Sequence, residues 1–298
     1  MKIGVTGGTG FIGKVFVSSV CGEHDLTVLT LEGESPVRFG SEEYVTSDFS
    51  REDMVQKFAG CDAIVHLAFA RPAASGADSV GNYFESIAIS ENVFGAASDL
   101  GIKNVVTLSS RSVYSASMEM PLTEERAEPY SVYGAAKLTV EKIGGICNAR
   151  GMKIKFLRCA QVMGVGERKN LMTVYFEKAR GKETLPVYGE GASTKTYIYV
   201  KDVARAIMCA LEHPDESGVF NIGMTHAVSN LELAKLYCEV FDNADNYVLL
   251  RDKKEDGEVW RLDVGKVQRR LGFSPAYDVR AALADMKRIT EENEARDQ

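Results

Sequence analysis

Several common signatures of metal and disulfide chemistry are missing from this sequence of 298 residues. Its six cysteines are widely scattered and form no C-x-x-C pair, and its four histidines show no ligand-like spacing. Four of the cysteines lie within apolar periodic runs, where a free buried thiol in a reducing compartment is the ordinary interpretation. We therefore expect free thiols and no bound metal.

Long apolar runs and long basic runs are also missing. No stretch approaches the roughly 20 apolar residues of a membrane span, and the strand-like start at 2–6 is not the apolar core of a signal peptide. These absences predict a cytoplasmic protein that does not enter a membrane. The formal charge of −7 argues against a nucleic-acid partner. A chain of this length and ordinary composition buries one large core or two modest ones.

The first half of the chain alternates short apolar strands with longer helical patterns. Strands are expected at residues 2–6, 26–30, 44–47, 63–68, 105–109 and 153–158, and helices at 11–21, 51–59, 80–100 and 130–150. Gly101 and Gly151 follow two of the helical patterns directly, as helix stops do. This alternation predicts an α/β fold with a Rossmann-type, doubly wound parallel sheet covered by helices on both faces.

The strand–helix rhythm loosens beyond Arg158. Glycine-rich stretches at 164–168 and 189–193 are typical of loops, and a strand at 196–200 precedes a helix at 202–211. A strand at 219–222, a helix at 230–241 and a last helix near 281–294 follow. We place a dinucleotide-binding domain at residues 1–160, with 196–220 returning to it. A smaller α/β substrate lobe is expected at 161–195 and 221–298.

A glycine loop, Thr6-Gly-Gly-Thr-Gly-Phe-Ile-Gly13, stands between a predicted strand and a predicted helix, the context that a dinucleotide-phosphate loop requires. Gly7 would allow the tight turn, Gly10 would let the backbone approach a pyrophosphate, and Gly13 would let the helix pack closely on the strand. The helix N-terminus, with Phe11-Ile12 in its first turn, adds N–H donors and a positive dipole end. We therefore expect the phosphates of NAD or NADP here.

The end of the second strand bears on which of the two cofactors binds. By register, the position that would hold a ribose 2′-hydroxyl is Thr30, which carries no acid. Glu32 lies two residues further on, and Arg38 is the first arginine that follows to meet a 2′-phosphate. The choice therefore stays open, with NAD preferred. After the third strand, Asp48-Phe49 either reaches the adenine amino group or caps the helix that begins near Arg51.

Tyr133 and Lys137 stand four residues apart in a helical pattern, which places them on one helix face. There the lysine can lower the phenol pKa from about 10 towards neutrality and hydrogen-bond a nicotinamide-ribose hydroxyl. Ser110 follows a strand, at the sheet edge where it can bond the substrate oxygen that Tyr133 protonates or deprotonates. The same spacing at 197–201 lies in a strand-like run, where the two side chains stand roughly 13 Å apart. A helix-face pair and a capping serine are the structural alternative.

Together these motifs resemble the extended short-chain dehydrogenases/reductases, namely the NAD-dependent epimerase/dehydratase (nucleotide-sugar epimerase) family. The segments that carry the resemblance are TGGTGFIG at 6–13, DAIVHLAF at 62–69, NVFGA at 92–96, VVTLSSRSVYS at 105–115, YGAAK at 133–137, YIYVKDVARAI at 197–207, FNIG at 220–223 and RRLGFSP at 269–275. It implies that Ser110 is the catalytic hydroxyl, Tyr133 the catalytic base and Lys137 its partner. It also implies further site residues: Asn92 near the active site, and Leu67, Ala68 and Ala70 along the cofactor.

The sequence departs from the family pattern on the substrate side. Dehydratases of the group carry Asp-Glu directly after the catalytic Thr, whereas Arg111-Ser112 follows Ser110 here, so 4,6-dehydration is disfavoured. Candidate substrate contacts are Arg71, Gln161, Lys195 and Arg251. Arg251 is favoured because it precedes a stretch that resembles the family's diphosphate-binding region. Ordinary surface solvation is the alternative for each cation.

Three functions fit these residues. The resemblance implies a nucleotide-linked sugar as substrate, and an epimerase needs only hydride transfer to bound NAD(P) with Tyr133 as acid and base. An NADPH-dependent keto-sugar or carbonyl reductase is the alternative, favoured by the lack of an acid at Thr30. A dinucleotide-sensing protein without turnover is disfavoured, because a pure binder needs no phenol and amine together. The helices at 80–100 and 130–150 would form the interface of a homodimer.

Overall fold

A seven-stranded parallel sheet is the centre of the computed structural model, which describes residues 1–70, 79–167, 170–255 and 257–296. The strand order is β10-β6-β5-β4-β1-β2-β3, so the predicted Rossmann-type fold is confirmed. The strands are β1 (Lys2–Thr6), β2 (Asp25–Thr30), β3 (Glu43–Thr46), β4 (Ala63–His66), β5 (Asn104–Ser110), β6 (Lys153–Cys159) and β10 (Gly218–Ile222). Since the chain order reverses between β1 and β4, the carboxyl ends of these strands border the crevice where such sheets bind ligands.

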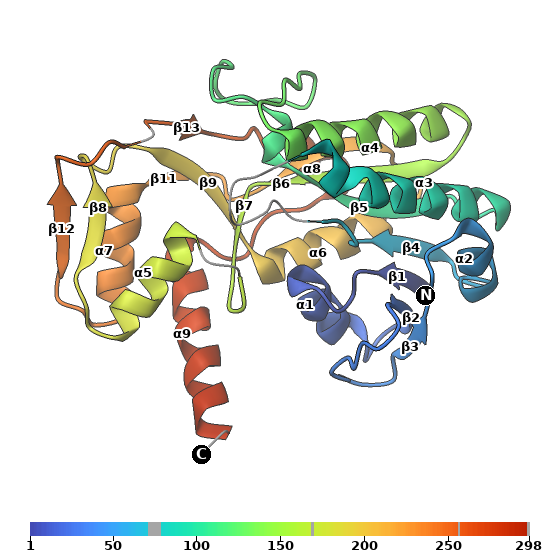
Figure 1. Cartoon of the computed structure of the whole chain (residues 1–298), viewed down its shortest axis with the longest axis horizontal. Helices are drawn as coiled ribbons and strands as arrows, with labels where there is room; N and C mark the ends of the chain where they lie inside the picture. The colour runs from blue at the N-terminus through green and yellow to red at the C-terminus, as the bar shows by residue number, and fades with distance from the viewer. Residues whose placement is uncertain (71–78, 168–169, 256, 297–298) are drawn as a thin grey trace.

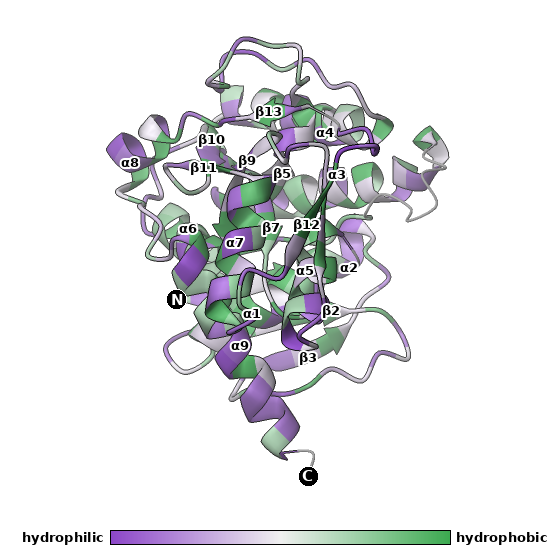
Figure 2. Cartoon of the chain, turned by 90° about the vertical axis from the view of Figure 1, so that its left-hand side faces the viewer, coloured by the Kyte–Doolittle hydropathy of each residue, from purple (hydrophilic) through white to green (hydrophobic). Residues whose placement is uncertain are grey.

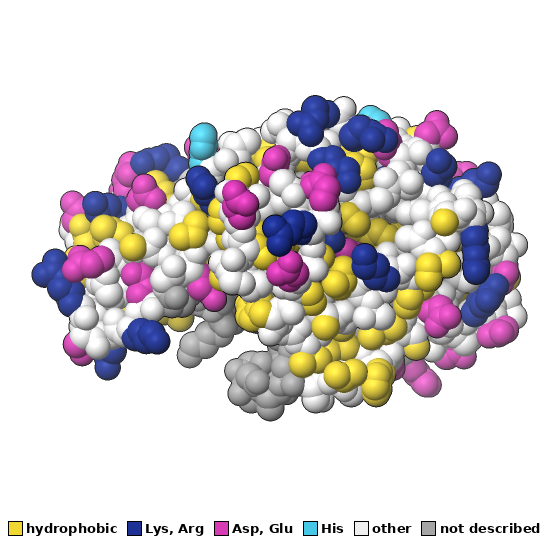
Figure 3. Space-filling view, turned by 90° about the horizontal axis from the view of Figure 1, so that it is seen from above, with side chains coloured by type: hydrophobic (Ala, Val, Ile, Leu, Met, Phe, Trp, Pro, Cys, Tyr) yellow, Lys and Arg dark blue, Asp and Glu magenta, His cyan; other side chains and the backbone are white. Residues whose placement is uncertain are grey.

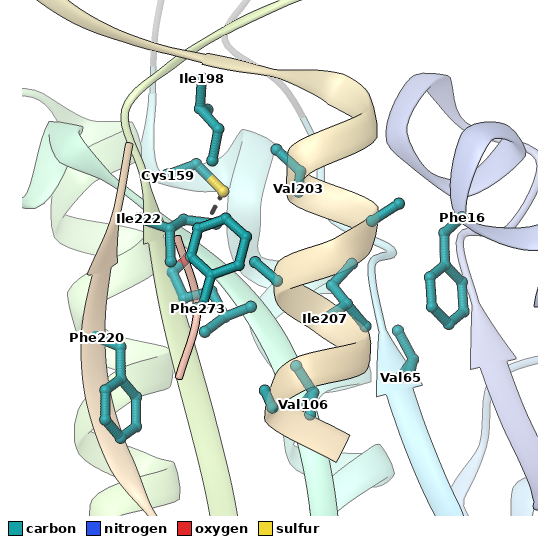
Figure 4. Close-up of a cluster of buried hydrophobic side chains, with 14 of the residues drawn as sticks. Phe16, Val65, Val106, Cys159, Ile198, Val203, Ile207, Phe220, Ile222 and Phe273 are labelled. Atoms are coloured by element: carbon teal, nitrogen blue, oxygen red, sulfur yellow. Dashed lines mark hydrogen bonds between the residues drawn. The ribbon is translucent and has the colours of Figure 1, made fainter. Parts of the chain in front are cut away.

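Helices cover both faces of this sheet (Figure 1). On one face lie α1 (Phe11–Val20) and α6 (Val200–Leu211), and on the other α2 (Arg51–Lys57), α3 (Phe84–Asp99) and α4 (Val132–Ala149). The predicted helix at 80–100 is divided, since a 3-10 turn, η1 (Val80–Tyr83), precedes α3. Figure 4 shows Val203 and Ile207 of α6 lying among Phe16, Val65 and Val106, all buried. A second buried cluster, with Met54 of α2, Phe94 of α3 and Val140 of α4, covers the other face, so apolar side chains seal both.

A smaller lobe packs beside the large sheet and has its own apolar core (Figure 1). Its strands are β7 (Gln161–Met163), β9 (Thr194–Tyr199), β11 (Ala227–Ser229) and β13 (Val259–Trp260), with β8 (Leu185–Tyr188) and β12 (Tyr247–Leu250) in a separate pair. Its helices are α5 (Leu171–Arg180), α7 (Asn230–Val240) and α9 (Val279–Arg296). Figure 2 shows that α9 is largely hydrophilic towards the C-terminus. A short helix, α8 (Gly265–Leu271), contacts β10.

The segment predicted to return to the large sheet, 196–220, divides between the two parts. Its first strand, β9, joins the smaller sheet, whereas α6 and β10 pack with the larger one. The second Tyr-x-x-x-Lys pattern falls at this division, so the expectation of one strand over 196–200 is wrong at its end. Tyr197 lies in β9, but Lys201 lies in the first turn of α6 and pairs with Asp285 at 2.6 Å.

The surface carries apolar side chains near α3 and α4. Figure 3 shows hydrophobic side chains gathered at the end of the molecule where these helices lie. Exposed large apolar residues there include Val80, Phe84 and Ile146. Within the described ranges, no helix is both long and apolar enough to traverse a bilayer. The same part of the chain holds no group of three or more His, Cys, Asp or Glu side chains placed to bind a metal ion.

Candidate active site

A cavity of about 460 Å³ opens where the glycine loop meets the carboxyl ends of β5 and β6. This is the edge of the sheet where the strand order predicts ligand binding. The structure brings ten of the predicted site residues to its wall: Gly7, Gly10, Phe11, Ile12, Gly13, Leu67, Ser110, Tyr133, Lys137 and Gln161. The predicted cofactor loop and the predicted proton-transfer residues therefore face one space.

The glycine loop has the shape that a dinucleotide phosphate needs. Gly7 has a φ of +71°, and a Cβ added there would lie 2.5 Å from the backbone nitrogen of Ala68. A Cβ on Gly13 would lie 2.1 Å from the Gly7 carbonyl oxygen, so only glycine lets α1 start this close to the loop. Gly10 is the N-cap of α1, and the N–H groups of the first turn lack intrahelical acceptors. Since these residues line the cavity, the loop fits a cofactor's pyrophosphate.

Ser110 ends β5 and begins the 3-10 turn η2 (Arg111–Val113). Its hydroxyl oxygen accepts a hydrogen bond from the Ser112 N–H at 3.1 Å and donates to the Ser112 hydroxyl at 3.2 Å. These bonds fix the Ser110 side chain at the mouth of the turn. The Ser110 hydroxyl is therefore held beside the cavity by the local backbone.

Tyr133 lies in the first turn of α4, which Ser131 caps by accepting from the Gly134 N–H at 3.1 Å. A Cβ added to Gly134 would lie 1.9 Å from the Ser112 carbonyl oxygen. Any larger residue would push α4 away from η2. The glycine after Tyr133 thus lets the helix carrying the phenol approach the turn carrying the serine. The Tyr133 ring packs against Phe69 and Tyr83, with ring centroids 6.0 and 5.7 Å away.

Lys137 is buried one turn beyond Tyr133 on α4. Its ammonium group donates to the Leu108 carbonyl at 3.0 Å and lies 3.6 Å from the centre of the Phe69 ring. Burial lowers the pKa of Lys137 to about 7, although the nearby Cys159 and Glu141 act in the opposite direction. A lysine in this state changes its charge near neutral pH, which is useful beside a proton-transferring phenol.

A buried ion pair lies beneath these residues. Arg158 on β6 donates to both carboxylate oxygens of Glu141 on α4, at 2.9 and 2.6 Å, and each side chain is 3% exposed. Ser109 donates to the same carboxylate at 2.5 Å, and Arg158 also donates to the Tyr114 hydroxyl at 2.7 Å. Although burial disfavours its charged form, the bonds and charge of Glu141 raise the pKa of Arg158. Through Ser109, which precedes Ser110, the ion pair links the end of β5 to α4, the helix that carries Lys137.

Some predicted cofactor residues lie outside the described cavity wall. Thr30 is buried at the end of β2, where its carbonyl accepts from the Ser47 N–H at 2.9 Å. Asp48 is exposed, and its carboxylate accepts from the Ser50 N–H at 2.8 Å. The alternative that Asp48 caps the next helix is wrong, because the hydroxyl of Ser50 caps α2 by accepting from the Asp53 N–H.

Asn92 and Phe49, both expected near the cofactor, bind one another. The Asn92 side-chain amide donates to the Phe49 carbonyl at 3.0 Å. Phe49 is buried with a φ of +57°, and its N–H donates to the Ser47 hydroxyl at 3.0 Å. A non-glycine residue in this conformation needs its surroundings to hold it. The structure therefore gives Asn92 a role in fixing the turn after β3.

The remaining predicted residues also stand away from the cavity wall. Ala68 contacts the glycine loop through its backbone, and the Ala70 N–H donates to the Ser86 hydroxyl at 2.9 Å. Lys195 lies in β9, and Arg251 is exposed and donates to the Glu190 carboxylate at 2.7 Å. Arg71 lies outside the described residues.

Sequence reasoning missed several residues of the wall. They are Phe69, Leu108, Ser109, Arg111, Ser112, Cys159, Ala160, Val162, Glu167 and Asn170. The strand order alone signals Leu108, Ser109 and Cys159, because residues at the ends of neighbouring parallel strands share one edge. Another missed residue is Glu34, whose carboxylate accepts from the Thr9 hydroxyl of the glycine loop at 3.3 Å. Its signal was an acid shortly after β2, four residues beyond Thr30.

Comparison with known proteins gives consistent matches. A model of the NAD dependent epimerase/dehydratase family matches residues 3–223. A dTDP-glucose 4,6-dehydratase of Streptomyces niveus is 29% identical over 306 residues, covering 96% of this chain and 90% of that protein. The crystal structure of UDP-N-acetylglucosamine 4-epimerase from Bacillus cereus has a TM-score of 0.87 at 29% identity, covering 97% of this chain and 99% of that one. MoeE5 in complex with UDP-glucuronic acid and NAD has a TM-score of 0.84 at 25% identity, covering 98% and 100%.

Proposed function

The chain belongs to the NAD dependent epimerase/dehydratase family, and from this premise we propose that it is a nucleotide-sugar epimerase that works with bound NAD. The observation that carries the proposal is the single cavity that joins the glycine loop to Ser110, Tyr133 and Lys137. The similar structures include a UDP-N-acetylglucosamine 4-epimerase and a protein bound to NAD and a UDP-sugar. A nucleotide-linked sugar is therefore the proposed substrate.

The cofactor would lie with its phosphates at Gly10 and the first turn of α1. When bound, its nicotinamide supplies a hydride acceptor and donor. Glu34 stands at the loop where an adenosine ribose would extend, and a carboxylate accepts from a 2′-hydroxyl but repels a 2′-phosphate. Arg38, the nearest cation in sequence, is held at the Glu42 carbonyl and over the Tyr44 ring. These contacts support NAD over NADP.

The protein's own residues would move the proton. The Tyr133 phenol takes the proton of the sugar hydroxyl as the carbon is oxidised, and returns it when the keto sugar is reduced on its other face. Ser110 donates a hydrogen bond to the same sugar oxygen and holds it in line. Lys137 places a titrating positive charge one helical turn from the phenol, which favours the phenolate form. The sugar carbon would thus regain its hydrogen in the opposite configuration, with no net oxidation of the sugar.

Dehydration would require an acid and a base that flank the sugar in addition to these residues. The dehydratases of the group carry Asp-Glu at the positions that Arg111 and Ser112 occupy here. Among the described residues of the wall, the only carboxylate is that of Glu167, which lies on a loop of the other lobe. This arrangement supports epimerisation, and the similarity to a dehydratase is one of family.

The proposal is tested with Tyr133→Phe, which removes one hydroxyl and keeps the ring packing. We expect turnover of a nucleotide sugar to fall by about 10²- to 10⁴-fold, the usual contribution of a general acid–base group. NAD identified by mass after denaturation should remain bound in both proteins. Tyr130→Phe is the matched control, since Tyr130 is exposed outside the described cavity wall. Equal turnover by Tyr133→Phe and wild type would refute the assigned chemistry.

We also propose that the chain pairs with a second copy of itself. The exposed apolar side chains Val80, Phe84 and Ile146 belong to η1, α3 and α4, the helices expected at the interface. Exposed apolar side chains on neighbouring helices are one mark of an association site. This supports a homodimer, which stays a prediction.

A further inference from the structure

Arg111 is a cavity residue that neither the sequence analysis nor the family pattern assigns. It follows Ser110 directly in η2, and both residues line the cavity. Consecutive Cα atoms are about 3.8 Å apart, so the guanidinium extends from a point beside the hydroxyl that meets the reacting sugar oxygen. The position therefore belongs to the sugar end of the cavity, close to the reacting carbon.

The guanidinium of Arg111 is held by contacts from the smaller lobe. It lies over the ring of Trp260 in β13, 4.7 Å from the ring centroid. Trp260 is fully buried and donates from its ring nitrogen to the Glu258 carboxylate at 2.6 Å. Gln161 in β7 accepts from Nη2 of Arg111 at 3.3 Å. A cation–π contact and one hydrogen bond therefore hold the guanidinium in place.

The charges around the cavity distinguish this end from the cofactor end. Among the described wall residues, the cationic side chains are Arg111 and Lys137, and the anionic one is Glu167. Lys137 is committed to the Leu108 carbonyl and the Phe69 ring. Arg111 keeps its charge at every physiological pH and carries several N–H donors in one plane, one of them on Nη2 bonded to Gln161. A neutral hydroxymethyl group carries no charge that pairs with a guanidinium, whereas a carboxylate does.

We propose that Arg111 recognises a carboxylate carried by the sugar, so that the substrate class is a nucleotide-linked uronic acid. This inference rests on the proposed function, since it names the sugar that the same site would epimerise. A guanidinium–carboxylate pair next to Ser110 would anchor the ring while its reacting carbon turns over between two faces. The diphosphate of the nucleotide is the other oxyanion that a guanidinium could hold, and the experiment separates the two.

Binding is measured by calorimetry in the Tyr133→Phe background with NAD present, so that no ligand is turned over. The probes are UDP-glucuronic acid, UDP-glucose and UDP. We expect UDP-glucuronic acid to bind about tenfold or more tightly than UDP-glucose, because hydrogen bonds to charged groups are the stronger ones. Arg111→Gln should remove this preference and leave the affinity for UDP unchanged. Arg111→Lys, which keeps the charge without the fork, should restore part of it.

Arg126→Gln is the matched control, because Arg126 is an exposed cation outside the described cavity wall. It should leave all three affinities unchanged. The inference would be overturned if the protein that keeps Arg111 bound UDP-glucuronic acid and UDP-glucose equally, or bound neither. So would an Arg111→Gln variant that weakens UDP as much as UDP-glucuronic acid, since the guanidinium would then hold the diphosphate. If the wild type turns over UDP-glucose but shows no preference for the uronic acid, the proposed function holds and the inference fails. If it prefers UDP-glucuronic acid but turns over neither sugar, the binding preference holds and the proposed function fails.

Discussion

Replacing the buried ion pair between Glu141 and Arg158 should show strong non-additivity in stability. Either single replacement, Glu141→Leu or Arg158→Met, leaves a charge buried with its partner removed. Both side chains are 3% exposed and joined by two hydrogen bonds of 2.6 and 2.9 Å. Losing one partner of such a pair costs about 3–5 kcal/mol of unfolding free energy. Simple addition would therefore give about 6–10 kcal/mol for the double variant.

The double variant should lose far less than that sum. Exchanging a whole buried pair for apolar side chains of similar volume is roughly neutral. The main remaining loss is a hydrogen bond of the wild type, in which the Ser109 hydroxyl donates to Glu141 at 2.5 Å. Leaving this buried donor unsatisfied costs about 1–3 kcal/mol. The Tyr114 hydroxyl keeps its bond to the Asn221 side chain at 2.7 Å. The expected coupling energy between the two sites is therefore at least about 3 kcal/mol.

Urea unfolding of the four proteins measures this coupling. Trp260 is the single tryptophan and is fully buried, so its fluorescence reports the smaller lobe while far-UV circular dichroism reports the whole chain. Coincident transitions by the two probes give the free energies directly. Arg51 and Asp99 form a matched exposed pair at 2.6 Å, and their cycle should give less than about 1 kcal/mol. A double variant of Glu141 and Arg158 that falls within about 0.5 kcal/mol of the sum would refute the reasoning.

Two further predictions concern the cofactor and pH. Glu34→Gln should narrow the preference for NADH over NADPH by about tenfold in a fluorescence titration, because a hydrogen bond to a charged group contributes about 1.5 kcal/mol. Glu32→Gln is the control. An unchanged ratio of the NADH and NADPH affinities in Glu34→Gln would contradict the role of Glu34. Burial lowers the pKa of Lys137 to about 7, so between pH 7 and 10 the unfolded chain binds the extra proton. The cofactor-free wild type should therefore gain stability relative to Lys137→Met as pH rises through this window, by up to about 1.4 kcal/mol per pH unit. Parallel stability curves would show that Lys137 is not desolvated.

The sheet and its catalytic edge were predictable because their signals are local and repeated. Each of the six predicted strands of the first half is present within two residues of its expected bounds. A parallel strand must end at the same edge as its neighbours, so Ser110 had to lie near the glycine loop. Helical spacing then brought Tyr133 and Lys137 to one wall. The contribution of Gly134, which permits the approach of α4, is visible only once η2 is placed.

Side chains that satisfy a distant backbone group could not be placed from sequence. Asn92 carries the family motif, yet it bonds the Phe49 carbonyl, because that residue's left-handed backbone needs an anchor from α3. Lys195 and Arg251 belong to strand and loop segments of the smaller lobe, where no periodic pattern fixes which way a cation points. Such residues are set by tertiary contacts that a motif does not encode.

Arg111 shows how a departure from a motif can carry information that the motif itself lacks. In the sequence, Arg111 only indicates that an acid needed for dehydration is missing at this position. In the structure it stands at the junction of the two lobes, with its backbone fixed by the β5–η2 turn and its guanidinium by Trp260 and Gln161. The backbone position follows from the catalytic edge and was predictable. The position of the guanidinium depends on Trp260 and Gln161 of the smaller lobe, and the sequence did not predict it. Under the proposed function the sugar lies between the same two lobes, and the residue at the position of the dehydratases' acid then selects which sugar binds.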